Sequence, residues 1–117
     1  MKILGLIILG ASFAAGQSLF DGKTLKGWVV QEKEAWIWKV KDGAIVGGSP
    51  NKNIPHNTFI STNKRYKNFE LTLQVKVKGK RPNAGIQIRS ERIEDHHEMI
   101  GYQADVGPGY WGKLYDE

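Results

Sequence analysis

The sequence predicts an all-β protein, a sandwich or barrel of short strands, and two observations carry this prediction. Apolar and polar residues alternate along several short stretches, and turn signals such as Asp-Gly and Lys-Gly separate these stretches. No window of useful length shows the periodicity of an amphipathic helix. The 117 residues suffice for about one small domain, and the chain has no cysteine with which to form a disulfide.

The predicted strands can be followed in order along the chain. Residues 36–46 form two apolar-containing segments around Asp42-Gly43, which indicates a β-hairpin with a tight turn. A short strand is expected over 58–62. The clearest strand is expected over 69–77, where apolar side chains share one face and polar side chains occupy the other.

Two further alternating segments, 83–90 and 100–106, are expected to lie side by side. Alternate side chains of a strand point to opposite faces of its sheet. We therefore expect the apolar residues to face inward and the outward face to carry a polar patch, floored by Gly85 and Gly101. This patch consists of Gln87, Arg89, Gln103 and Asp105.

Aromatic residues follow the polar patch at once in the sequence. Tyr110, Trp111 and Tyr115 lie among several glycines, a composition typical of an exposed turn. A saccharide needs hydrogen bonds to its hydroxyl groups and an apolar platform for its C–H face, so the combination indicates a saccharide site. A simpler interpretation is also open, in which Arg89 and Asp105 form a solvated cross-strand ion pair on an ordinary sheet surface.

The first sixteen residues, 1–16, have the pattern of a secretory signal peptide, which leaves 17–117 as the domain. Lys2 gives a positive start, an apolar run follows, and small residues lead to Gly16. The apolar run is too short to span a bilayer, and no cysteine is present for lipid attachment. We therefore expect an exported protein, periplasmic or extracellular, without a membrane span in the mature chain.

The charge distribution argues against a nucleic-acid partner. The formal net charge is +5, or +4 without Lys2, and the basic residues are scattered except within 76–81. That run is expected to mark a strand end and turn. Since nucleic-acid binding needs a broader basic surface, no nucleic acid is expected as a partner.

A second group of polar residues is the run His96-His97-Glu98. Imidazole and carboxylate groups together can bind a divalent metal. Adjacent side chains on a strand point to opposite faces, so both histidines could bind one ion only if the run lies in a loop. The alternative is a charged connection between two strands. No metal ligand is assigned on this pattern, and no cofactor is expected.

Five segments of the chain occur in a characteristic order: Leu19–Trp28, Trp38–Ile45, Tyr66–Leu71, Asn83–Arg89 and Gly101–Asp105. In this order the chain resembles the 3-keto-disaccharide hydrolase domain family, over residues 18–117. The resemblance implies a jelly-roll β-sandwich of the concanavalin or laminin-G type that acts on glycosides. Domains of that family are usually longer, so we expect residues 17–117 to be the N-terminal part of a domain that is incomplete at its C-terminus.

The resemblance further implies cleavage of a 3-keto-glycoside at a site on the concave sheet. A base must take the proton beside the ketone, and a polar donor must stabilise the enolate. Asp105 is the expected base and Arg89 the expected donor. A glycosidase mechanism with two carboxyl groups, Asp105 with Asp116 or Glu117, is the alternative chemistry.

The expected substrate-binding residues come partly from the resemblance and partly from the pattern of the two strands. Where many relatives carry an acidic residue, this chain has the amide Gln103, which can bind a hydroxyl group but cannot act as a base. A non-catalytic carbohydrate-binding module on the same scaffold, or a structural sandwich without a sugar site, would also fit the sequence. The expected binding residues are Asn83, Gln87, Gln103, Trp111 and Tyr115.

Overall fold

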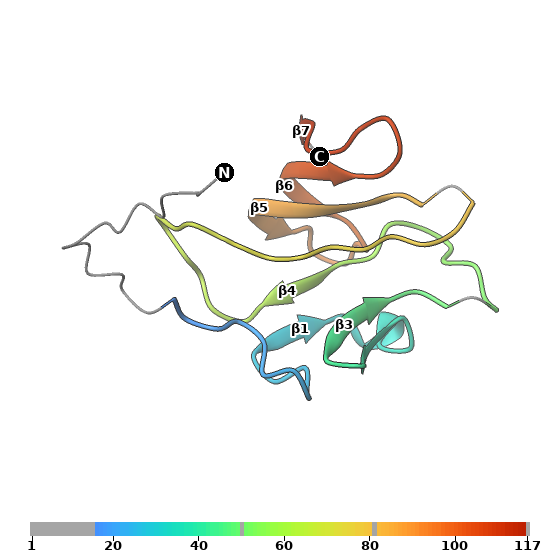
Figure 1. Ribbon diagram of the computed structural model, residues 1–117, viewed down its shortest axis with the longest axis horizontal. Helices are drawn as coiled ribbons and strands as arrows, with labels where there is room; N and C mark the ends of the chain where they lie inside the picture. The colour runs from blue at the N-terminus through green and yellow to red at the C-terminus, as the bar shows by residue number, and fades with distance from the viewer. Residues whose placement is uncertain (1–15, 50, 81, 117) are drawn as a thin grey trace, which may run out of the picture.

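Seven short strands and one helical turn make up the regular structure of the part of the chain that is described. The computed structural model describes residues 16–49, 51–80 and 82–116. In this part of the chain the strands pair antiparallel into three sheets, β1–β4, β2–β3 and β5–β6–β7, and the helical turn is the 3-10 segment η1 (Figure 1). The predicted all-β class is confirmed, and the several antiparallel sheets fit a β-sandwich domain. The elements are β1 (Trp28–Val30), η1 (Glu32–Glu34), β2 (Trp38–Lys41), β3 (Ala44–Gly47), β4 (Ile60–Thr62), β5 (Ala84–Arg92), β6 (Met99–Val106) and β7 (Leu114–Asp116).

The predicted hairpin is present as strands β2 and β3. Lys41 pairs with Ala44, so the connecting turn has two residues. Asp42 and Gly43 both have positive φ, at 51° and 72°, as a type I′ turn requires. Ile37, which immediately precedes β2, is the most deeply buried apolar side chain among the described residues, at 1% exposure.

The predicted strand over 58–62 is also confirmed, in the shorter form of β4. Its partner is β1, with Trp28 opposite Thr62 and Val30 opposite Ile60. The indole of Trp28 donates a hydrogen bond to the carbonyl of Leu19 at 2.9 Å, which ties the segment before β1 to the sheet.

The Asp21-Gly22 turn before β1 is held by the carboxylate of Asp21. Its Oδ1 accepts hydrogen bonds from the backbone N–H groups of Lys23 and Thr24, and its Oδ2 accepts one from the Thr24 hydroxyl. The hydroxyl bond is the largest contribution, followed by the backbone bonds, and together they lower the pKa of Asp21 from 3.8 to about 2. The turn therefore loses this support only in strong acid.

The segment expected to be the clearest strand, 69–77, does not pair with any strand in the described part of the chain. Figure 1 draws it as an extended stretch without an arrow between β4 and β5 in the sequence. Its apolar side chains are largely exposed; Phe69 is 47% and Leu73 46% exposed. The prediction of a paired strand is wrong here because alternation favours an extended backbone but does not supply a hydrogen-bonding neighbour.

Strands β5 and β6 form the longest hairpin of the domain, and β7 pairs with the other side of β6. Gly85 lies opposite Asp105, and Gln87 lies opposite Gln103. The expected side-by-side arrangement of these segments is therefore confirmed, and so is the prediction that these polar residues share one face. We call this the polar face of the sheet.

The expected inward and outward directions are wrong over most of this hairpin, although Val106 is buried as expected, at 5% exposure. Ile88, Ile100 and Tyr102 on the apolar face are 37%, 51% and 46% exposed. The side chains on the polar face are instead partly shielded, and the half-buried ones include Gln87, Gln103 and Asp105.

The polar face turns toward the sheet formed by β1 and β4, and Arg92 makes the connection. Its Nη2 donates hydrogen bonds to the carbonyl of Phe59 at 3.2 Å and, at 3.4 Å, to the carbonyl of Val29. Met99, the partner of Arg92 in the ladder, is buried. A guanidinium group that binds backbone carbonyls in this way draws the polar face inward, which the alternation pattern alone does not reveal.

Two expectations concern the N-terminal segment and the membrane. The predicted signal peptide, 1–16, lies outside the described residues except for Gly16. Among the residues that are described, no helix has the length and hydrophobicity needed to cross a membrane.

Candidate functional site

A row of three polar side chains crosses the polar face of the three-stranded sheet. Gln87 of β5 pairs directly with Gln103 of β6, and Gln103 pairs on its other side with Tyr115 of β7. Directly opposed residues of an antiparallel ladder have Cβ atoms about 4.5–5.5 Å apart on the same face. Three of the predicted binding residues are thereby brought together, and we call them the polar row.

Asp105 lies beside the polar row, two residues along β6 from Gln103. The amide of Gln103 donates a hydrogen bond to Asp105 Oδ1 at 3.0 Å. Gly85, the ladder partner of Asp105, leaves room for this arrangement, because a Cβ atom at position 85 would collide with the Gln103 side chain. The glycine predicted as the floor of the patch therefore positions Gln103 and, through it, the carboxylate.

The backbone of Asp105 is fixed by the turn between β6 and β7. Its N–H donates to the carbonyl of Lys113 at 2.9 Å, and its carbonyl accepts from the N–H of Gly112 at 2.8 Å. Trp111 lies in the same turn and is 55% exposed, as is Tyr115. The structure thus places exposed aromatic rings on the segment that holds the backbone of Asp105.

Arg89 occupies a different position from the one expected. A β-bulge interrupts the pairing between Ile88 and Glu91, and Arg89 has a φ of 54° within it. Arg89 is also four residues along β5 from Gly85, the partner of Asp105, which corresponds to roughly 13 Å of strand. No ion pair joins Arg89 to a carboxylate among the described residues, so the simple cross-strand pair with Asp105 does not form.

The guanidinium group of Arg89 is directed to the segment that precedes 69–77. Its Nη2 lies 3.4 Å from the carbonyl of Lys67, and the two residues line a shallow hollow of about 290 Å³. Arg89 therefore lies near the far end of the polar face from Asp105. The other residues of the hollow are Asn68, Phe69 and Ile88.

The remaining predicted residues lie at the margins of the site. Asn83 is exposed and immediately precedes β5. Asp116 pairs with Tyr102, so it lies on the apolar face, opposite to Asp105. A two-carboxyl arrangement of Asp105 with Asp116 is therefore not assembled, and Glu117 lies outside the described residues.

Three buried polar atoms on β5 have no hydrogen-bond partner among the described residues. They are Oε1 of Gln87, Oγ of Ser90 and Nη1 of Arg92. Buried polar atoms are nearly always satisfied by protein, water or ligand, so this set marks a stretch of polar face with unused hydrogen-bonding capacity. The sequence pattern did not identify Ser90 and Arg92. The bulge shifts the alternation of β5 there, and β5 itself has no glycine or proline at that point.

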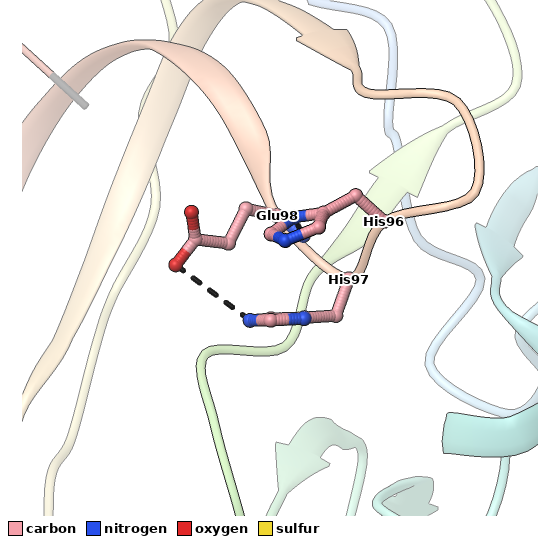
Figure 2. A group of neighbouring side chains, drawn as sticks. All are labelled: His96, His97 and Glu98. Atoms are coloured by element: carbon pink, nitrogen blue, oxygen red, sulfur yellow. Dashed lines mark hydrogen bonds and ion pairs between the residues drawn. The ribbon is translucent and has the colours of Figure 1, made fainter.

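The run His96-His97-Glu98 provides the donor atoms that could hold a metal ion. It lies in the loop between β5 and β6, and the three side chains offer ligand atoms within 4.8 Å of one another (Figure 2). This is the loop placement that the sequence required for both histidines to act together.

A comparison of the chain with models of protein families finds a match. The model of the 3-keto-alpha-glucoside-1,2-lyase-like domain, which is the 3-keto-disaccharide hydrolase domain, matches residues 15–117. The chain belongs to this family. No curated protein and no solved structure matches the chain at a significant level.

Membership of the 3-keto-alpha-glucoside-1,2-lyase-like family confirms the resemblance seen in the sequence. It supports a carbohydrate-related role for the domain, and the hydrogen-bonding groups and aromatic rings around Asp105 suit a saccharide.

Proposed function

We propose that this domain is a carbohydrate-active enzyme that cleaves 3-keto-glycosides by hydrolysis or elimination on the polar face of β5, β6 and β7. The family match supports the class of substrate. The observation that carries the proposal is the hydrogen bond from Gln103 to Asp105, next to the exposed ring of Tyr115. A carboxylate, neutral amides and an aromatic platform are the groups that a sugar needs at a cleavage site.

In the proposed reaction, Asp105 accepts the proton from the carbon beside the ketone, and the electron pair forms an enolate. The glycosidic C–O bond then breaks as the carbon–carbon double bond forms, and the proton passes from Asp105 to the leaving oxygen. In hydrolysis, water would then add to the new double bond of this product. In elimination, the unsaturated product would leave the site without further change. Gln103 orients the carboxylate because its amide donates to Oδ1 and leaves Oδ2 for the proton.

Arg89 lies roughly 13 Å along β5 from the partner of Asp105, which is too far to stabilise an enolate formed beside that carboxylate, and we propose that it contributes to substrate binding instead. Its position near the far end of the polar face suits a sugar unit that extends along β5 away from Asp105. Gln87, midway between them in the ladder, donates its amide to the carbonyl of Met99 at 3.2 Å, and its Oε1 is buried without a hydrogen-bond partner among the described residues.

The test is turnover of a 3-keto-glycoside by the Asp105→Asn variant, because this change removes the base and keeps the shape. We expect turnover to fall by about 100-fold or more, since a positioned base typically contributes about 10²–10⁴-fold. Asp116→Asn is the matched control, as it alters a carboxylate on the opposite face and should leave turnover unchanged. Equal losses in both variants, or full turnover in Asp105→Asn, would remove Asp105 from the mechanism.

A second candidate is a non-catalytic carbohydrate-binding module. The observation that favours it is the position of Asp116 on the apolar face, which leaves Asp105 without a second carboxylate from β7. Binding of a saccharide by the parent chain without any turnover would establish this candidate in place of the enzyme.

We further propose that the protein is exported to the periplasm or the cell exterior. The support is the N-terminal pattern of Lys2, an apolar run and the small residues up to Gly16. N-terminal sequencing of the protein recovered outside the cytoplasm should begin at Gln17, whereas recovery of the intact chain in the cytoplasm would contradict export.

A further inference from the structure

All 3 histidines of the sequence meet at the closed end of the β5–β6 hairpin. The ring of His97 lies between the other two, with centroid distances of 3.9 Å to His56 and 4.3 Å to His96. They line an open cavity of about 620 Å³ together with residues of η1. Side chains from three distant segments therefore converge at a place that the proposed sugar reaction does not use.

The donor atoms of His97 and Glu98 are already spaced for a shared ion. Figure 2 shows the two side chains facing each other, with His97 Nε2 3.6 Å from Glu98 Oε1. Two ligands of a tetrahedral ion with bonds of about 2.1 Å lie roughly 3.4 Å apart. His96 lies alongside, and its Nδ1 accepts only a long bond of 3.2 Å from the Glu98 N–H, which a metal could replace.

The proton position on His56 leaves its other nitrogen available. His56 Nδ1 lies 2.8 Å from the carbonyl of Asn57, and since a carbonyl only accepts, Nδ1 carries the proton. The same Nδ1 lies 3.5 Å from Oε1 of Glu34. In the neutral ring Nε2 then holds the lone pair, and a carboxylate behind the protonated nitrogen is the usual support of a metal-binding histidine.

Glu34 gives an independent reason to expect a cation here. It is only 3% exposed, and its Oε2 accepts a hydrogen bond from Thr58 at 2.8 Å. Its Oε1 accepts no hydrogen bond within the described part of the chain, although Nδ1 of His56 lies 3.5 Å from it. A buried carboxylate with an unsatisfied oxygen is costly unless positive charge lies nearby.

The net charge around the cavity is negative as well. Its lining carries the carboxylates of Glu32, Glu34 and Asp95 against the ammonium group of Lys33, and Lys52 places a second ammonium group 3.8 Å from the ring centre of Trp36, another lining residue. Glu98 adds another carboxylate beside His97. A bound dication would offset this charge.

We infer that this cluster is a binding site for a divalent transition-metal cation of the zinc type. His97, Glu98 and His96, whose ligand atoms lie within 4.8 Å of one another, form its core, a mixture of imidazole and carboxylate that suits Zn²⁺. His56 lies outside that group but in ring contact with His97, and its Nε2 would turn toward the ion as the fourth donor. The ion would fasten the loop that carries His56 to the β5–β6 hairpin. Gln31 already makes one link of this kind, as its amide donates to the carbonyl of His96 at 2.7 Å.

The test is titration of Zn²⁺ alone into the chelator-treated chain, followed by calorimetry and by thermal unfolding. We expect saturable binding of about one ion per chain and a higher unfolding temperature with Zn²⁺. His97→Ala and Glu98→Gln should each abolish saturable binding. Glu34→Gln should weaken it by roughly 10–100-fold, the usual loss when a supporting carboxylate is removed.

Glu70→Gln is the matched control, because Glu70 is exposed and does not line the cavity. It should bind Zn²⁺ as the parent does. Circular dichroism in the presence of chelator identifies any variant that does not fold, and if His97→Ala fails this check, Glu98→Gln decides the result. Absence of saturable binding by the parent, or equal binding by the parent and the folded core variant, would overturn the inference.

Discussion

The two ends of the β5–β6 hairpin assemble their polar groups in different ways. Near Asp105, the groups come from strands that are joined by direct ladder pairing, as in Gln87, Gln103 and Tyr115. Near His97, a loop meets side chains from segments far away in the sequence. The first end is therefore organised by local sheet geometry, and the second by tertiary contact.

This difference predicts different consequences of mutation. A change at the ladder end alters the direction of one or two side chains, because the strands themselves remain paired. A change at the histidine end also loosens the connection between distant segments, because Gln31 and His56 both reach the β5–β6 loop. Catalytic measurements should thus report on the first end, and metal-dependent stability on the second.

The largest expected effect separates the two ends directly. Asp105→Asn should lower turnover by about 100-fold or more and leave Zn²⁺ binding unchanged. His97→Ala should abolish Zn²⁺ binding and leave the turnover of the folded chain unchanged. Both quantities can be measured on the same protein samples, and a loss of both in either variant would show that the two ends form one site.

A smaller effect is expected from Gly85→Ala, which tests how the ladder end is built. The added Cβ would collide with the Gln103 side chain and displace its hydrogen bond to Asp105. Overpacking of this kind costs about 1–3 kcal/mol, measurable by chemical denaturation. Adding Gln103→Ala should recover most of the stability but not the turnover. Full stability of the single variant, or no recovery in the double variant, would contradict this role of Gly85.

Much of the ladder end could be predicted from the sequence because strand alternation has a fixed period. It placed Gln87, Gln103 and Asp105 on one face, and the turn signal at Asp42-Gly43 correctly located a hairpin. Alternation does not say which face turns inward. The contacts of Arg92 with β1 and with Phe59 accompany an inward polar face, and nothing local in the sequence encodes them.

Other parts of the structure could not be predicted for related reasons. The bulge at Arg89 changes the direction of a side chain, and the glycine that accompanies it, Gly101, lies on the partner strand rather than on β5. Segment 69–77 has the strongest alternation of the chain, but pairing depends on a neighbouring strand edge. Burial of Glu34 beside His56 depends on two segments meeting in space, so the histidine cluster could be anticipated only in part, from His96-His97-Glu98.

The central claim is that saccharide binds on the polar face beside Asp105. The most direct measurement is a crystal structure of the Asp105→Asn variant with a bound 3-keto-glycoside, which that variant should not consume. We expect the sugar to lie over the polar row, within hydrogen-bond distance of Gln103 and the side chain at position 105. A sugar bound on the apolar face at Ile88 and Tyr102, or at the histidine cluster, would contradict the claim.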